Sequence, residues 1–130
     1  MTLIIDPSKV GFEKVLRNYQ IEALKIIWHS TNKSLSSREV FQQVNKNLKN
    51  RVISRASIIN FLNNMCEEKI LKYEEEACKG GLKRRYYAEL NDEQFKKYIV
   101  KTVFDSLAKD FPEQTVEAVK DSFRELNLSF

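Results

Sequence analysis

Apolar residues recur at spacings of three and four between Leu16 and Trp28, and this period predicts a first helix. Its apolar face consists of Leu16, Ile21, Leu24, Ile27 and Trp28. Asn18 is the candidate N-cap, and the polar run 32–34 ends the helix. Residues 1–13 have no clear period, so they predict either an extended arm or an ordered lead-in.

Two more helices are predicted before residue 70. Ser36 and Glu39 have the spacing of a capping box, which opens a short second helix. Its apolar face is Val40, Phe41, Val44 and Leu48. Ser54 is the expected N-cap of the third helix, predicted over Ser54–Glu68. The apolar face of this helix is Ile58, Phe61, Leu62 and Met65.

The period then changes from helix to strand. Residues 70–74 and 82–88 predict two antiparallel strands, joined by a turn at 77–81 whose paired glycines tolerate positive φ. Leu35 is a lone apolar residue placed for a short strand that pairs with this hairpin. Alternation of strand faces should bury one of Tyr86 and Tyr87, and we interpret both, together with Tyr73, as core rather than as base-stacking platforms.

Two amphipathic helices are predicted in the tail. Asn91 caps the first, with Gln94 in the capping-box position, and Pro112 suits the first turn of the second. Two short helices cannot bury both apolar faces between themselves, so they need the winged domain or another subunit, and their aromatic content favours a substantial interface, here a homodimer. The candidate dimerisation residues are Phe95, Tyr98, Ile99, Val103, Leu107, Val116, Val119 and Phe123.

The order of these elements predicts a mainly α fold with a small β-hairpin. Three helices followed by a two-stranded hairpin are typical of a winged helix-turn-helix, here residues 1–90, and residues 91–130 form a helical dimerisation region. The chain holds only three Gly and two Pro, which argues against a β-sandwich or barrel.

The charge is distributed unevenly along the chain. Residues 1–90 hold 16 Lys and Arg against 10 Asp and Glu, a net charge of +6, whereas residues 91–130 hold 6 against 8, a net charge of −2. A basic first part joined to an acidic second part favours a polyanion-binding module attached to a region with another role.

The third helix has an amide-rich face opposite its apolar face. At about 100° per residue, this outward face holds small and amide side chains and no carboxylate before Glu67. Asn can pair with adenine through two hydrogen bonds, Ala can contact a thymine methyl, and Arg suits guanine or phosphate. The alternative is an ordinary solvated helix face. The candidate base-reading residues are Arg55, Ala56, Ser57, Asn60, Asn63 and Asn64.

Two basic clusters flank this helix in the predicted fold. Either cluster alone could be solvated surface, but the pair around one amide-rich helix favours contacts to DNA phosphates. The candidates before the helix are Lys46, Lys49 and Arg51, together with Arg55. Those on the hairpin are Lys79, Lys83 and Arg84, with Arg85 beside them.

No pattern in the sequence indicates catalysis, a cofactor or a metal. The single His29 has no Cys, Asp or Glu at metal-ligand spacing, and Lys79-Gly80-Gly81 lacks the phosphate-loop pattern. Cys66 and Cys78 are not spaced as a metal or redox pair, which favours free thiols in a cytoplasmic protein over a disulfide. No run of 18 apolar residues occurs, so no membrane partner is expected.

Four segments of the chain resemble the penicillinase-repressor family, which includes methicillin-resistance and copper-responsive repressors. They are LRNYQIEALKIIW, SSREVFQQV, SRASIINFLNNMCEEKIL and RRYYAEL, and the resemblance runs from Leu16 to Leu107. It implies a homodimeric repressor of a palindromic operator in double-stranded DNA, with the third helix and wing on DNA and the C-terminal helices dimerising. By this resemblance the groove-facing positions are Arg55, Ser57, Asn60 and Asn64, with Lys83 and Arg84 on the wing.

The chain departs from the family pattern at several positions. Arg17 stands where the family has a Ser or Thr cap, and Ile59 and Asn63 stand where basic residues are common. The tail has no cysteine, which argues against copper sensing. The alternative hypothesis is a winged helix that binds proteins within an assembly and does not read DNA. The sequence does not indicate an inducer.

Overall fold

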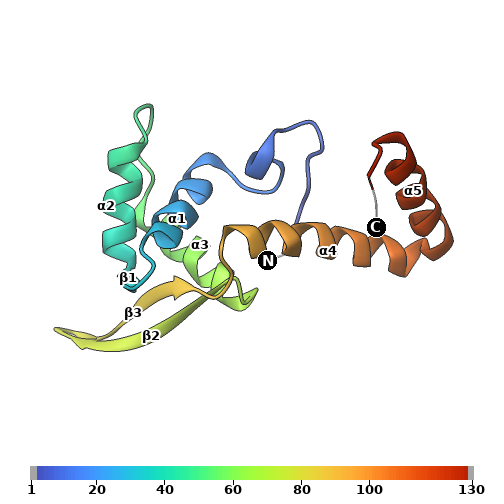
Figure 1. The fold of residues 1–130 in the computed structure, drawn as a ribbon. Coiled ribbons are helices and arrows are strands. Elements are labelled where there is room, and N and C mark those ends of the chain that lie inside the picture. The colour runs from blue at the N-terminus through green and yellow to red at the C-terminus, as the bar shows by residue number, and fades with distance from the viewer. Residues whose placement is uncertain (1–2, 129–130) are drawn as a thin grey trace. The chain divides into compact units, whose positions relative to one another are not determined.

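The computed structural model describes residues 3–128, which form a small sheet and several helices (Figure 1). In chain order the elements are η1 (Gly11–Lys14), α1 (Asn18–His29), β1 (Leu35–Ser36), α2 (Ser37–Asn47), α3 (Arg55–Glu67), β2 (Leu71–Cys78), β3 (Gly81–Ala88), α4 (Asp92–Asp110) and α5 (Pro112–Glu125). The chain divides into two compact units between Glu93 and Gln94, and each is described by itself.

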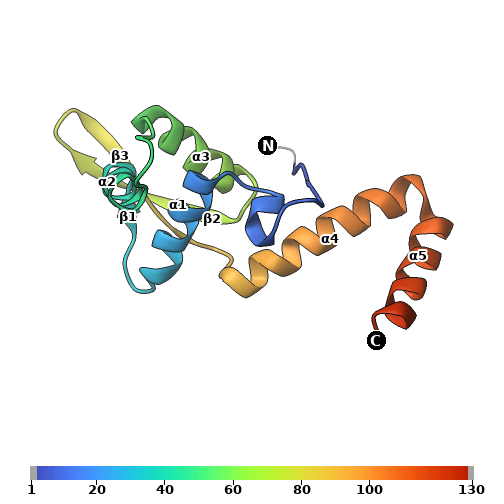
Figure 2. The same cartoon turned by 90° about the horizontal axis from the view of Figure 1, so that it is seen from above.

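The core of the first unit lies between α1, α2, α3 and the sheet. Every helix contributes the apolar face that its sequence period predicts, and burial of each large side chain stabilises the fold by about 1.5–3 kcal/mol. The buried members of these faces are Leu16, Leu24, Ile27, Val40, Val44, Ile58, Phe61, Leu62 and Met65. The hairpin reaches out beyond the three helices in both views (Figures 1 and 2).

The start of the first helix differs from the prediction. Arg17 is the N-cap and Asn18 is the first helical residue, so Asn18 does not cap the helix. Gln20 Oε1 accepts the Arg17 N–H at 2.9 Å, which is the Gln half of a capping box, and no side-chain hydrogen bond from Arg17 caps the helix. The segment before the helix is an ordered lead-in, because the ring of Phe12 lies 5.6 Å from that of Trp28.

The other two helices begin as the sequence predicts. The hydroxyl of Ser36 accepts the Glu39 N–H at 3.2 Å, and Glu39 Oε1 accepts the Ser36 N–H at 3.1 Å, which completes the capping box. Ser54 Oγ accepts the Ser57 N–H at 3.1 Å and so caps α3. After α3 the chain turns at Lys69, whose φ of 62° ends the helix.

The sheet has three antiparallel strands in the order β1-β3-β2. Leu35 pairs with Tyr86, which confirms the short strand expected there. The hairpin strands are longer than predicted: β2 and β3 pair as far as Cys78 and Gly81, so the turn is only Lys79-Gly80 rather than residues 77–81. A φ of 99° at Gly80 explains why glycine is needed in so tight a turn.

Three consecutive glutamates account for the added strand length. Glu74, Glu75 and Glu76 on β2 lie opposite Arg85, Arg84 and Lys83 on β3. Opposite charges on facing positions of antiparallel strands stabilise the pairing, by roughly 0.2–1 kcal/mol per pair. A search for apolar alternation could not reveal this part of the hairpin, because the consecutive residues Glu74–Glu76 occupy both faces of β2.

The tyrosines of the sheet divide between core and surface. Tyr86 is buried, as expected for one member of the Tyr86–Tyr87 pair. Tyr73 and Tyr87 are each 37% exposed, so their interpretation as core residues is only partly right. Tyr87 follows Tyr86 on β3, so strand alternation places it on the other face of the sheet, and Tyr73 lies opposite Tyr86 on the edge strand β2.

The second unit consists of the remainder of α4 and α5. The helix α4 begins directly after Asn91, and Pro112 occupies the first turn of α5. Phe95 and Tyr98 stack with ring centroids 6.1 Å apart. Together with the first unit, these helices confirm a mainly α fold with a small sheet, that is, a winged helix followed by a helical tail.

Candidate nucleic-acid interface

The outward face of α3 offers polar side chains to solvent along its first two turns. Arg55, Ala56 and Asn60 are exposed, and Ser57 and Asn64 are half-buried at the edges of the face. No large apolar side chain of α3 is exposed. A face of this size and polarity can enter a major groove, where amide and guanidinium groups match the edges of bases.

The turn between α2 and α3 is held by the side chain of Asn45. Its Oδ1 accepts the Ile53 N–H at 2.7 Å, and its Nδ2 donates to the Ile53 carbonyl at 3.0 Å and to the Phe41 carbonyl at 3.2 Å. Ile53 is buried, whereas Arg51 and Val52 on the same turn are exposed. Asn45 therefore fixes how the turn presents its cations and how the chain enters α3.

Four exposed cations lie between the end of α2 and the start of α3. They are Lys46, Lys49, Arg51 and Arg55. Their side chains form no hydrogen bond or ion pair within residues 3–128, and the segment that carries them contains no acid. Such cations are available to phosphate oxygens, and each phosphate neutralised releases condensed counterions from DNA.

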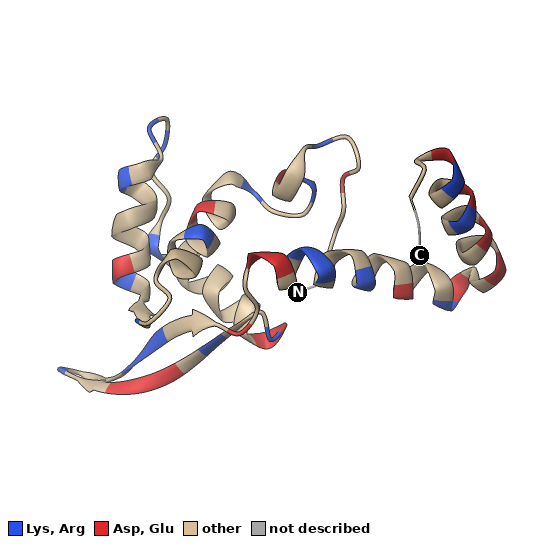
Figure 3. Cartoon of the chain, in the orientation of Figure 1, with Lys and Arg blue, Asp and Glu red and all other residues tan. Residues whose placement is uncertain are grey.

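Four of the five cations of the wing, residues 71–88, have protein partners instead. Arg85 is held most firmly: it donates to the Ser34 carbonyl at 2.7 Å and lies 3.2 Å from Glu39 and 3.4 Å from Glu76. Lys83 lies 4.0 Å from Glu76. Figure 3 shows the acidic band of β2 alongside the basic band of β3. Lys79 at the turn is exposed, and its side chain has no partner among the described residues.

Asn63 joins α3 to the wing. Its Oδ1 accepts the Tyr86 hydroxyl at 2.7 Å and Arg84 at 3.0 Å. The guanidinium of Arg84 also lies 4.0 Å above the ring of Tyr73. These contacts turn Asn63 and Arg84 toward each other, whereas Asn60 has no hydrogen-bonding partner in the part of the chain that the structure describes.

One thiol lies at the same junction. Burial raises the pKa of Cys66 to about 11, and the nearby Arg84 lowers it by a smaller amount. Burial likewise raises the pKa of the Tyr86 hydroxyl. Both groups are therefore neutral at pH 7, which suits a packed junction between α3 and the wing. Cys66 and Cys78 are both free thiols.

The structure brings together most of the candidates that the sequence indicated, on α3 and the turn before it. Three features were not predicted from the sequence: the hydrogen bonds of Asn45, the anchoring of Arg85, and the glutamates that face the basic strand. The third could have been found from the run Glu74–Glu76 in a predicted hairpin. The first two depend on side-chain directions that no spacing reveals.

The geometry defines a winged-helix protein with a helical tail. The sequence profile described as "Penicillinase repressor" matches residues 18–127, and the chain belongs to that family of transcriptional repressors. No curated protein matches the chain. A solved structure described as "Possible transcriptional regulator from Methanosarcina mazei Go1" is similar in fold, with a TM-score of 0.58, 14% identity and 78% of each chain covered.

Two negative findings concern the described residues alone. Within residues 3–128, no helix is long and apolar enough to cross a membrane. In the same range, no three His, Cys, Asp or Glu side chains converge as ligands for a metal ion.

Proposed function

We propose that this protein is a sequence-specific DNA-binding repressor that acts as a homodimer on a palindromic operator, without catalysis and without a cofactor. The observation that carries the proposal is the arrangement around α3: an exposed face of Arg55, Ala56 and Asn60 beside three further unpaired cations, Lys46, Lys49 and Arg51. Amides supply base reading, and the cations supply attraction to phosphates.

The contacts of the protein with DNA divide into two kinds. Arg55, Ser57, Asn60 and Asn64 meet base edges, while Lys46, Lys49 and Arg51 meet phosphates on the flank. On the wing, Lys79 is free to reach the backbone. Asn63 and Arg84 support the wing through each other, so their contribution to base reading is smaller than that of Asn60.

The helical tail supplies the dimer. It carries large apolar side chains exposed in the single chain, including Val100, Phe111 and Leu126. The candidate dimer residues Leu107 and Val116 are each 46% exposed, and Ile99 and Phe123 are half-buried. A second copy would cover such a surface and would place two α3 helices on half-sites one or more DNA turns apart.

The test begins with selection of bound sequences from random double-stranded DNA by the full chain. We expect an enriched inverted repeat, and anisotropy titrations should give affinity for it that falls steeply with salt. Lys25→Ala serves as a control, because Lys25 is exposed on α1 and belongs to neither basic cluster. Failure to enrich any sequence would contradict the proposal, and enrichment of single half-sites would contradict the dimer.

The other reading, a module that binds proteins, requires an exposed apolar patch on α3 or the wing. The exposed face of α3 is polar, and the exposed apolar residues of the wing are Tyr73, Leu82 and Tyr87. None of these three lies on α3, so the polar face of this helix favours DNA as its partner.

A further inference from the structure

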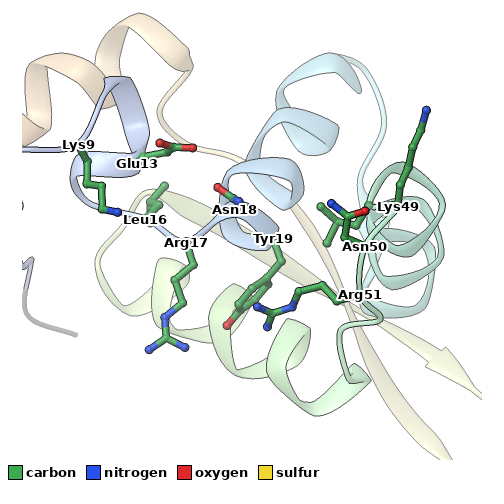
Figure 4. A pocket seen from close by; sticks show the side chains of 10 residues that line it. Lys9, Glu13, Leu16, Arg17, Asn18, Tyr19, Lys49, Asn50 and Arg51 are labelled. Atoms are coloured by element: carbon green, nitrogen blue, oxygen red, sulfur yellow. The ribbon is translucent and has the colours of Figure 1, made fainter.

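A hollow of about 600 Å³ lies in the first unit, where the lead-in, the start of α1 and the chain after α2 meet (Figure 4). Four cations line it: Lys9 from the lead-in, Arg17 before α1, and Lys49 and Arg51 after α2. Its volume falls in the range of about 300–1,000 Å³ that is usual for small-molecule sites.

The charge of this hollow is not balanced by the protein. Glu13 is the one acid among its lining residues, and it forms no ion pair with any of the four cations. The cations themselves have no hydrogen-bonded or ionic partner among the described side chains. A concave surface lined by one sign of charge concentrates ions of the opposite sign. An anion is therefore the ligand that this surface favours.

The lead-in that carries Lys9 is held in place by hydrogen bonds. The Asp6 N–H donates to the Lys14 carbonyl at 2.7 Å, and Lys14 Nζ donates to the carbonyls of Pro7 and Lys9. On the other side, Asn45 fixes the chain that carries Arg51, through Ile53. The walls are thus largely formed before any ligand binds, which lowers the entropic cost of binding.

An aromatic ring forms part of the wall. Tyr19 is half-buried, and its ring meets that of Phe61 edge-on with centroids 6.3 Å apart. Figure 4 shows the Tyr19 side chain between those of Arg17 and Arg51. A flat ring joined to an anionic group could therefore stack on Tyr19 while its charge meets the guanidinium groups.

We propose that this hollow binds a small phosphorylated molecule with a flat ring, of the nucleoside-monophosphate type. Arg17 and Arg51 hold the phosphate, Lys9 and Lys49 complete the positive field, and Tyr19 stacks on the ring. If the proposed DNA binding holds, the ligand competes with DNA, because Lys49 and Arg51 also face phosphates of the operator. The molecule would then act as an inducer.

Calorimetric titration of the full chain with adenosine monophosphate tests the site without DNA. We expect measurable binding, and binding at least about tenfold weaker for adenosine and for inorganic phosphate, since each lacks one half of the recognised chemistry. Arg17→Gln should weaken binding at least about tenfold, whereas Lys25→Gln, the matched loss of a charge outside the hollow, should leave it unchanged. Absence of binding, or equal binding by both variants, would overturn the proposal.

A competition experiment tests the consequence for DNA. Adenosine monophosphate should release the selected operator from the wild-type chain, and the release should exceed that caused by sodium sulfate at equal ionic strength. Arg17→Gln should abolish the difference. Should Arg17→Gln instead weaken DNA binding while the nucleotide binds to neither protein, the hollow holds a DNA phosphate and the small-molecule proposal is wrong. A chain that binds the nucleotide but no DNA would contradict the proposed function alone.

Discussion

The turn before α3 and the wing both look basic in the sequence, yet they offer their charge differently. The segment 46–55 has four cations and no acid, whereas the wing has five cations and three acids. On the turn, Lys49 and Arg51 have no partner in the described part of the chain. On the wing, Arg85 and Lys83 face Glu76. The turn therefore presents its full charge to solvent, and the wing presents a reduced charge.

This difference shows that a basic residue can serve the fold or a ligand, depending on its neighbours. An exposed ion pair such as Lys83–Glu76 stabilises the protein by only about 0–1 kcal/mol, so a DNA phosphate could replace Glu76 as the partner of Lys83. Arg85 is different, because it is 20% exposed and donates to the Ser34 backbone as well. Loss of its side chain would weaken the attachment of the wing to the segment at Ser34 rather than remove a DNA contact.

The largest effect is expected at Asn45, which holds the turn before α3. Asn45→Ala removes both hydrogen bonds to Ile53 and leaves a buried backbone N–H and carbonyl without partners. We expect the free energy of unfolding to fall by about 2–4 kcal/mol. Urea unfolding measures this, with Gln43→Ala on the exposed side of α2 as a control expected to change it by less than about 0.5 kcal/mol.

The same variant should also disturb the turn. If Asn45 positions the free cations, Asn45→Ala should weaken operator binding under conditions where the protein stays folded. Full affinity in a folded Asn45→Ala protein would show that the turn keeps its shape without this side chain.

Two asparagines of α3 are expected to have different roles: Asn60 contacts DNA, and Asn63 supports the wing. Asn60→Ala should leave stability unchanged, weaken operator binding by about 1–3 kcal/mol and relax one position of the site. Asn63→Ala should lower stability by about 1–2 kcal/mol, because the Tyr86 hydroxyl and Arg84 lose their shared acceptor. Urea unfolding and repeat selection of the operator measure both. If only Asn60→Ala lowered stability, the assignment of Asn63 to the wing and of Asn60 to DNA would be wrong.

The helical part of the fold could be predicted from the sequence because its information is local. Ser36 with Glu39 and Ser54 act within one turn of chain, and the apolar faces of α2 and α3 follow the helical period. The strand at Leu35 followed from the fold that this order implies. Arg17 was harder to predict as the N-cap, because a guanidinium has no acceptor for a helical N–H, and the bond at this helix end runs from the Arg17 N–H to Gln20.

The candidate site was only partly predictable. Helical angles placed Asn60 and Asn63 on the same outward face, and only the packed wing distinguishes them. The extended hairpin was missed because Glu74–Glu76 place charge on both faces of β2, so no apolar alternation marks the strand there. The hollow at Arg17 could not be foreseen either, because it joins residues 9–19 to residues 48–51.

Salt dependence tests the charge difference directly. Arg51→Ala should lower the slope of log affinity against log salt by about one, the value for one full phosphate contact. Lys83→Ala should lower it by less, because Glu76 competes with DNA for this lysine. Glu76→Gln should strengthen binding several-fold at low salt. Anisotropy titrations at four or more salt concentrations measure the slopes, and a larger change for Lys83 than for Arg51 would contradict the assignment.

The smallest expected effect is a difference in reactivity between the two cysteines, which lie at opposite ends of the wing. Cys78 is exposed near the turn, whereas Cys66 lies at the junction of α3 with the wing. A pKa of about 11 leaves Cys66 about 0.1% ionised at pH 8, so a disulfide reagent should modify Cys78 first in the folded protein. Cys78→Ser should remove the fast phase, and Cys66→Ser should leave it.

Because folding raises the pKa of Cys66, the folded state holds the thiol proton more tightly than the unfolded state. The stability that this difference contributes should be lost between about pH 9 and pH 11. Urea unfolding across that range should show a smaller decline in Cys66→Ala, and an equal decline would place the cause in the similarly raised pKa of Tyr86.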